Sequence, residues 1–135
     1  MIKEMNVIYH ESQQIDGVNN VPVNQLQIIS NGYVEKMTLY CMDNMVASDR
    51  MTVCSEAAKK IKVGGEMLVR FTNLDLVQKQ IASGDLTSDK YSAILPTIQS
   101  VWSEKDFHSW LDSIGYDLDS QHYEGIYTVA TIRKK

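Results

Sequence analysis

Several features that would fix a function are missing from the 135 residues. No apolar run approaches the roughly 18 residues that cross a bilayer, and Met1–Asn6 has no apolar signal core behind a basic stretch. Basic residues number 13 against 17 acidic ones, a net charge of −4, and they form no clustered face of the kind that drives nucleic-acid binding. We therefore expect a cytoplasmic protein with neither a membrane nor a nucleic acid as its partner.

Residues that hold metals or act as nucleophiles are few and scattered. The two cysteines, Cys41 and Cys54, form no CxxC pair, so we expect free thiols rather than a metal site. The three histidines, His10, His108 and His122, show no paired-ligand spacing, and surface positions explain them better than catalysis. The sequence accordingly predicts no metal and no catalytic residue.

The length and the strand-like segments indicate a single α/β domain. A chain of 135 residues suits one domain. The first third alternates extended stretches, rich in β-branched and aromatic residues, with turn residues such as Asn31-Gly32. The predicted strands are Met5–Tyr9, Val21–Ile29 and Val34–Met42.

The rest of the chain carries stronger signals. Apolar residues recur at helical spacing from Met51 to Ile61, with Ser48-Asp49 as the expected N-cap and Gly64-Gly65 as the expected stop. The strand Glu66–Phe71 follows, which predicts a βαβ unit with parallel strands. Further helices and a final antiparallel hairpin should complete the domain. We expect the helices at Leu74–Ile81, Thr87–Gln99 and Ser103–Ile114, and the hairpin strands at Tyr116–Tyr123 and Ile126–Ile132.

Three motifs in this part of the chain resemble one family. Lys60–Val69 (KIKVGGEMLV) resembles the "LKPGG-x-L" junction of class I S-adenosylmethionine-dependent methyltransferases. Asn73–Leu76 stands where that family often has a "PDLD"-like turn, and Phe107–Tyr116 (FHSWLDSIGY) is similar to its F-x-x-x-L-x-x-x-G-F helix. The resemblance covers Val34–Lys135. It implies a three-layer, incomplete Rossmann-like sheet, mostly parallel, with an antiparallel C-terminal hairpin.

The segment before Val34 departs from the family. The resemblance implies a glycine-rich loop after the first strand, because the backbone must closely approach the methionine part of the cofactor there. The sequence has HESQQ at residues 10–14 instead, with no glycine before Gly17. We therefore divide the single domain 1–135 into a shortened, divergent part, 1–33, and a family-like part, 34–135. The missing loop predicts that no cofactor is bound, with S-adenosylmethionine as the alternative.

Candidate site residues lie at the ends of predicted strands. If a cofactor is bound after all, its contacts are expected from His10 and Glu11 after the first strand and from Asp43 and Asn44 after the strand Val34–Met42. For the last two residues, a structural role in a loop or helix start is the stronger interpretation, because Asp and Asn favour caps and turns.

Aromatic residues crowd the C-terminal part and supply candidates for an interface. Tryptophan and tyrosine concentrate in interface hot spots, and an incomplete sheet would leave an apolar face or a bare edge to be covered. The interaction candidates are Trp102, Trp110, Tyr123 and Tyr127.

Three functional hypotheses follow from the sequence. The preferred one is a degenerate methyltransferase-like domain that acts as a non-catalytic structural or assembly subunit, with a protein partner or a second copy of itself. The alternative is an S-adenosylmethionine-dependent methyltransferase, or its helper subunit, with an atypical cofactor loop at His10–Gly17. The third is an α/β adaptor whose likeness to the family is accidental.

Overall fold

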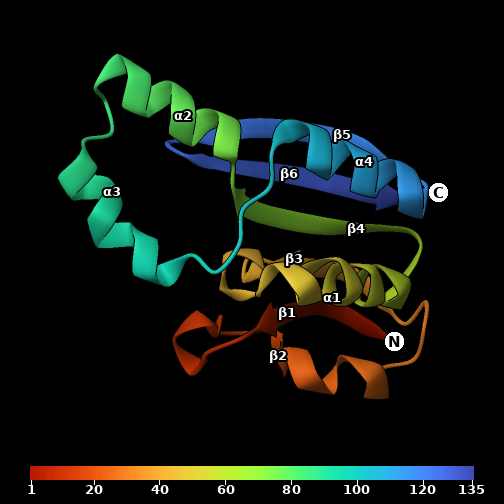
Figure 1. Cartoon of the computed structure of the whole chain (residues 1–135). Helices are drawn as coiled ribbons and strands as arrows, with labels where there is room; N and C mark the ends of the chain where they lie inside the picture. Colours follow the sequence, from red (N-terminus) through yellow and green to blue (C-terminus); the bar gives the residue numbers. More distant parts are fainter.

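Six strands form one mixed sheet in the computed structural model, which describes residues 1–135. The spatial order of the strands is β2-β1-β3-β4-β6-β5 (Figure 1). Strands β1 to β4 pair in parallel, whereas β6 runs antiparallel to both β4 and β5. The predicted mostly parallel sheet with an antiparallel C-terminal hairpin is therefore confirmed. The strands are β1 (Ile2–Ile8), β2 (Asn19–Pro22), β3 (Val34–Leu39), β4 (Ile61–Thr72), β5 (Tyr116–Glu124) and β6 (Tyr127–Lys134).

Short and long helices connect these strands. The two that were predicted best have strong local caps. The side chain of Asn73 accepts from the backbone at the start of α2, and Ser103 forms a capping box with Asp106 at the start of α4. None of the helices has the length and apolar character that crossing a bilayer requires. The α-helices are α1 (Ala47–Lys60), α2 (Leu74–Ser83), α3 (Ser88–Ile94) and α4 (Glu104–Ile114), and the 3-10 helices are η1 (Glu11–Gln13), η2 (Val23–Ile28), η3 (Met42–Asn44) and η4 (Leu95–Thr97).

The helices α1, α4 and η2 lie against the same face of the sheet (Figure 1). The middle of the sheet therefore has two layers rather than the three that were expected. The reason is the connection from β1 to β2, which has only ten residues, Tyr9–Val18, and contains no helix longer than η1. It is too short to lay an α-helix across the opposite face. We call that opposite face the far face. Its half-buried side chains include Lys36 and Thr38 of β3, Leu68 and Arg70 of β4, and Val129 and Thr131 of β6.

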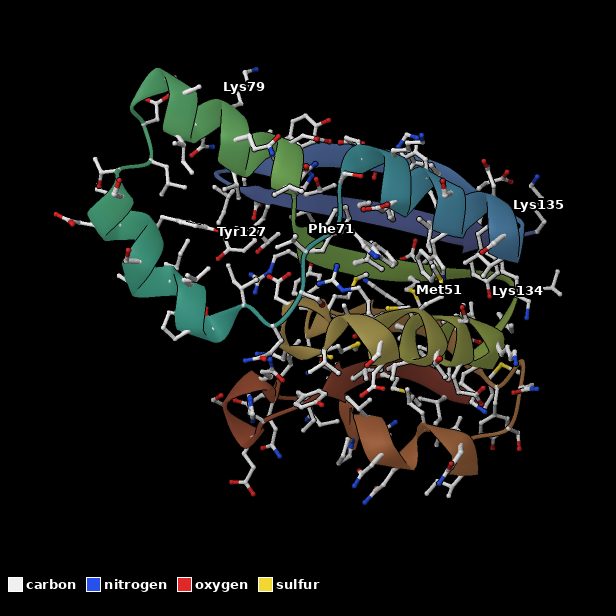
Figure 2. All side chains as sticks on the ribbon, in the orientation of Figure 1. Met51, Phe71, Lys79, Tyr127, Lys134 and Lys135 are labelled. Carbon is white, nitrogen blue, oxygen red and sulfur yellow. The ribbon has the colours of Figure 1, made fainter.

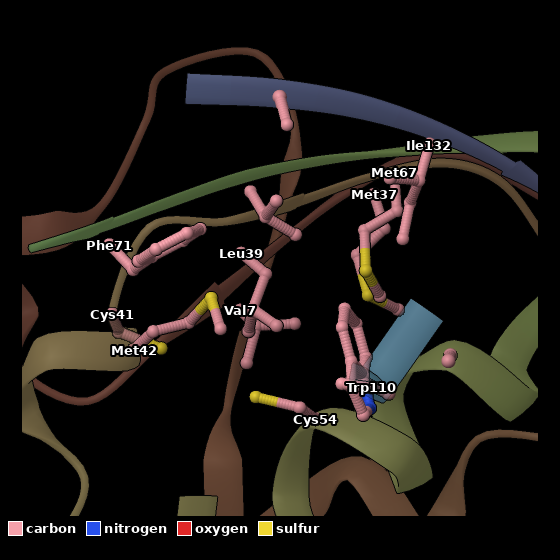
Figure 3. Packing of buried hydrophobic residues seen from close by; sticks show 14 of the residues in the cluster. Val7, Met37, Leu39, Cys41, Met42, Cys54, Met67, Phe71, Trp110 and Ile132 are labelled. Atoms are coloured by element: carbon pink, nitrogen blue, oxygen red, sulfur yellow. The ribbon is translucent and has the colours of Figure 1, made fainter. Parts of the chain in front are cut away.

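The hydrophobic core fills the space between the sheet and its single helical layer. It is one cluster of 22 buried residues drawn from every strand except the two edges. Figure 3 shows Met37, Met67 and Ile132 of the sheet converging on Trp110 of α4. Both cysteines are buried and free, as predicted.

Two local predictions differ from the structure. The expected strand Val21–Ile29 ends at Pro22, and Val23–Ile28 forms η2 because this turn brings Leu26 into the core. The glycines Gly64-Gly65 do not stop α1, which ends at Lys60. They lie inside β4, where its register with β3 shifts, and Gly65 has no room for a side chain because a Cβ would lie 2.7 Å from the carbonyl oxygen of Glu35.

Candidate functional site

The order of the strands creates a crevice at the carboxyl end of β1. This strand pairs with β2 on one side and with β3 on the other, so the chain reverses its direction of winding there. Ligands of open α/β sheets bind in the crevice at such a switch point. A cavity of about 500 Å³ lies at this place, within the range of small-molecule sites. This switch-point cavity is lined by Ile8, Tyr9, Pro22, Val23, Asn24, Met45, Asp49 and Val53.

The lining of the switch-point cavity combines apolar walls with two polar groups. Ile8 and Met45 are buried beneath it, and Val53 of α1 forms part of its side. Asn24 and Asp49 are exposed at its rim, so their amide and carboxylate are open to a ligand. Such a site suits a ligand that has an apolar part and polar groups able to hydrogen-bond with an amide and a carboxylate.

The side chain of Gln13 spans the crevice between the ends of β1 and β3. Its Oε1 accepts hydrogen bonds from the backbone N–H groups of Tyr9 (2.6 Å) and His10 (3.0 Å), and its Nε2 donates to Oδ1 of Asn44 (2.6 Å). Its backbone carbonyl accepts a hydrogen bond from Nδ2 of the buried Asn6 (2.8 Å). The loop after β1 is therefore fastened both to its own strand and to the loop after β3.

The carboxylate of Asp43 is turned away from the cavity. Oδ1 accepts from the backbone N–H of Thr72 (2.7 Å), and Oδ2 accepts from the Thr72 hydroxyl (2.8 Å). The guanidinium of Arg50 lies 3.5 Å from Oδ1. These contacts join the carboxyl end of β3 to that of β4.

Arg50 is a buried cation beside this carboxylate. Its Nη2 donates to the carbonyl oxygens of Met42 (2.9 Å) and Ser100 (2.7 Å), and the guanidinium carbon lies 5.1 Å from the ring centre of Trp102. Burial lowers the pKa of Arg50, and the charge of Asp43 opposes that shift. Nε and Nη1 are buried without a partner. The residue links α1 to the segment before α4.

The structure brings together only part of the predicted cofactor set. His10 and Asn44 meet through Gln13, whereas Glu11 is exposed on η1 and Asp43 faces Thr72. Three further residues border the crevice: Gln13, which lies in the segment His10–Gly17 but was not singled out, and Asn24 and Asp49, which were not predicted to be there. Asp49 was expected only as part of a helix cap, but the cap residue of α1 is Val46. Their position depends on strand order, which no local motif reveals.

The four interaction candidates separate into two groups. Trp102 and Trp110 are buried in the core, where they cannot contact a partner of the folded chain. Tyr123 is 53% exposed, and its hydroxyl donates to Glu104. The ring of Tyr127 lies 5.2 Å from the guanidinium of Arg70 on the far face. Figure 2 shows Tyr127 near α3, where it packs against the small cluster of Val77, Leu86 and Ile126.

Solved structures with the same arrangement of strands and helices identify the fold. An S-adenosylmethionine-dependent methyltransferase of Thermotoga maritima, described as a possible histamine N-methyltransferase, superposes with a TM-score of 0.67 at 11% identity, over 98% of this chain and 82% of the other. The chain has the class I methyltransferase fold. No protein-family model matches its sequence, and no curated protein matches it. At this identity the likeness establishes the fold and not the activity.

Two other methyltransferase-fold structures bear on ligands and partners. The 1,6-didemethyltoxoflavin-N1-methyltransferase of Burkholderia thailandensis, solved with S-adenosylhomocysteine bound, has a TM-score of 0.59 at 11% identity over 97% of this chain and 60% of the other. A Haloferax volcanii methyltransferase in complex with the Trm112 activator has a TM-score of 0.63 at 9% identity, over 97% of this chain and 71% of the other.

These neighbours contradict the prediction that no cofactor is bound. One of them is described as an S-adenosylmethionine-dependent methyltransferase, and another was solved with S-adenosylhomocysteine bound. The sequence resemblance began only at Val34, whereas the superpositions cover 97–98% of the chain and so include residues before it. The lack of a glycine motif did not justify the prediction that no cofactor is bound. The crevice arises from the order of β2, β1 and β3 rather than from glycine residues.

Proposed function

We propose that the chain is a methyltransferase-fold domain that binds S-adenosylmethionine in the switch-point cavity, with His10–Gly17 as an atypical cofactor loop. The observation that carries the proposal is the cavity of about 500 Å³ at the carboxyl ends of β1 and β2. Its size and place are those of a ligand site in an open α/β sheet. The solved methyltransferase structures of the same fold support the choice of ligand.

The residues of the cavity fit the nucleoside half of this cofactor. Ile8, Val23 and Val53 offer apolar surface to an adenine ring. Asn24 follows β2, and Asp49 lies in the first turn of α1, so both polar side chains reach the rim from separate elements. They would hold the ribose hydroxyls, for which amide and carboxylate oxygens are good acceptors. The amino-acid half would extend toward β3, where Gln13 lies.

When bound, S-adenosylmethionine supplies a methyl group activated by its positively charged sulfur. The contribution of the chain is binding and orientation, because a methyl transfer depends on the alignment of the two reactants. The apolar walls formed by Ile8 and Met45 keep water from one side of the ligand, and Asn24 and Asp49 fix its rotation in the cavity.

Calorimetric titration with S-adenosylmethionine and S-adenosylhomocysteine tests the proposal. We expect micromolar binding of both, and a loss of about tenfold or more for Asp49→Ala, because a hydrogen bond to a charged group contributes about 1.5–3 kcal/mol. Asp112→Ala is the matched control, since Asp112 is an exposed aspartate of α4 that lies outside the cavity. The proposal would be overturned if neither S-adenosylmethionine nor S-adenosylhomocysteine bound to the folded wild-type chain.

A second candidate function is a non-catalytic assembly or interaction subunit, and the bare far face favours it. Sheets with parallel strands usually bury both faces beneath helices, whereas Leu68 and Val129 are only half-buried here. The outer edge of the sheet is less suited to pairing with another strand. The edge strand β5 has the charged residues Asp117 and Asp119 and a bulge before Ser120, features that disfavour edge-to-edge association.

Sedimentation equilibrium tests this candidate for self-association. A dimer that forms through the far face should give about twice the mass of the chain. Leu68→Lys should restore the monomer, because it places a charge in the middle of that face, between Thr38 and Thr131 of the neighbouring strands. Ile81→Lys is the control, because Ile81 is an exposed apolar residue on α2. A wild-type chain that remains monomeric at about 100 μM, far above the concentrations at which specific dimers dissociate, would exclude self-association as its role.

A further inference from the structure

We propose that the side chain of Gln13 is an internal competitor for the cofactor site. It occupies backbone donors that the amino-acid half of the ligand would otherwise use, so that full binding requires this side chain to leave. The inference rests on the proposed function and concerns the regulation of that same site. Three observations carry it: the hydrogen bonds of Gln13, its place beside the cavity, and the independent anchor of its backbone.

The carboxamide of Gln13 makes the contacts that a bound ligand would make. The N–H groups of Tyr9 and His10 are the first that follow the last residue of β1, and both donate to Gln13 Oε1, at 2.6 and 3.0 Å. A carboxylate placed between them would accept the same two hydrogen bonds and, being charged, would bind them more strongly than the neutral amide does. Nε2 meanwhile holds Oδ1 of Asn44 on the other side of the crevice.

The contacts of Gln13 border the switch-point cavity on two sides. Tyr9 itself lines the cavity, and Asn44 directly precedes Met45, which lines it as well. The Gln13 side chain therefore lies between the end of β1 and the loop after β3, which is the point where the winding of the sheet reverses. A ligand longer than a nucleoside would extend from the cavity into this position.

The Gln13 side chain caps η1 through the backbone N–H of His10, and the backbone of this loop has a second anchor that does not involve that side chain. The carbonyl oxygen of Gln13 accepts from Nδ2 of Asn6, and the same Nδ2 donates to Oδ1 of Asn20. Asn6 is buried, so it fixes the loop from below. Gln13 itself is only half-buried. Its side chain can turn toward solvent while the loop backbone keeps its place. We call this side chain, which can close or open the site, the Gln13 latch.

The closed position of the Gln13 side chain lowers the apparent affinity of the site for such a ligand. A ligand that binds only the open arrangement has its affinity reduced by the fraction of chains that are open. Three hydrogen bonds of modest net strength hold the closed arrangement, two of them exposed and the one to Asn44 partly buried. Removing them should therefore tighten the binding of an amino-acid-bearing ligand by about tenfold.

Calorimetry with two probes on four chains tests the latch. The probes are S-adenosylhomocysteine and 5′-methylthioadenosine, which has the nucleoside and the thioether but lacks the amino-acid carboxylate. Gln13→Ala should bind S-adenosylhomocysteine about tenfold more tightly than the wild type does and 5′-methylthioadenosine equally well. Gln13→Glu should bind S-adenosylhomocysteine more weakly, because a carboxylate at this position keeps the two N–H groups and repels the ligand. The control is Gln14→Ala, whose side chain is exposed.

The outcomes separate the latch from the proposed function. Opposite changes for the two Gln13 variants, confined to S-adenosylhomocysteine, support the latch, because general loosening of the loop would shift both variants in the same direction. If both probes bind and neither Gln13 variant changes the ratio of their affinities, the latch is refuted and the cofactor site stands. If neither probe binds any folded chain, the proposed function fails and the latch fails with it.

Discussion

Replacing Asp43 by alanine should weaken the fold without weakening ligand binding. The carboxylate receives two hydrogen bonds from Thr72, at 2.7 and 2.8 Å, and faces the guanidinium of Arg50 at 3.5 Å. Because Thr72 is fully buried, its N–H and hydroxyl would be left without partners. The cation of Arg50 would lose its counter-charge as well.

The expected loss of unfolding free energy is about 3 kcal/mol. Each hydrogen bond to a charged group contributes about 1.5–3 kcal/mol, and we take the lower values because the Asp43 side chain is 17% exposed and water can partly replace it. The Arg50 side chain is only 2% exposed, so the loss of its partner adds to the cost. The Asp43→Asn variant keeps one acceptor for Thr72, and its loss should be smaller.

Urea denaturation measures this loss directly. A change of 3 kcal/mol moves the midpoint by about 1.5 M if the slope is about 2 kcal/mol/M. The Asp112→Ala control should stay within about 0.5 kcal/mol of the wild type. Titration with S-adenosylhomocysteine at a temperature where the variant is folded should give the wild-type affinity. A loss of stability below about 1 kcal/mol, less than one such hydrogen bond, or a selective loss of ligand binding, would refute the structural role of Asp43.

Three further predictions concern buried or half-buried residues. Gly65→Ala should lower stability by about 2–3 kcal/mol, because its Cβ would lie 2.7 Å from the carbonyl oxygen of Glu35, and an unchanged melting temperature would contradict this. Burial raises the pKa values of Cys41 and Cys54 to about 12, so both thiols should react with a disulfide reagent at pH 8 only after unfolding, and rapid labelling of the native chain would be the contrary result. Burial also raises the pKa of Tyr116 to about 12 from the ordinary value of 10.0. The folded chain then holds this proton more tightly than the unfolded one, so stability should fall as the pH rises from 10 to 12, and melts of Tyr116→Phe should show a flatter profile there.

The elements that could be predicted from the sequence carry their signals locally. Asn73 and Ser103 cap α2 and α4 with their own side chains, and Gly115 ends α4 in the left-handed conformation. The hairpin of β5 and β6 turns at Gly125, which also has a positive φ. These features need no knowledge of distant residues.

The features that could not be predicted depend on distant neighbours. Gly65 is required by the carbonyl of Glu35 on the adjacent strand, and η2 forms because Leu26 packs into the core. The site is a stronger case, since Gln13 and Asn44 meet from 31 positions apart. Asn24 and Asp49 share a cavity only because β2, β1 and α1 converge there. No spacing within the sequence encodes these encounters.

Because the helices cover only one face of the sheet, the cost of a substitution in stability depends on which face the side chain lies on. Along β3, β4 and β6, every second side chain packs in the core, and the residues between them, such as Thr38, Leu68 and Thr131, face away from the helices. A replacement at these half-buried positions disturbs less packing than a replacement in the core does, so it costs less stability. In this chain, substitutions should therefore be tolerated more readily on one side of the sheet than on the other, where volume and polarity are restricted.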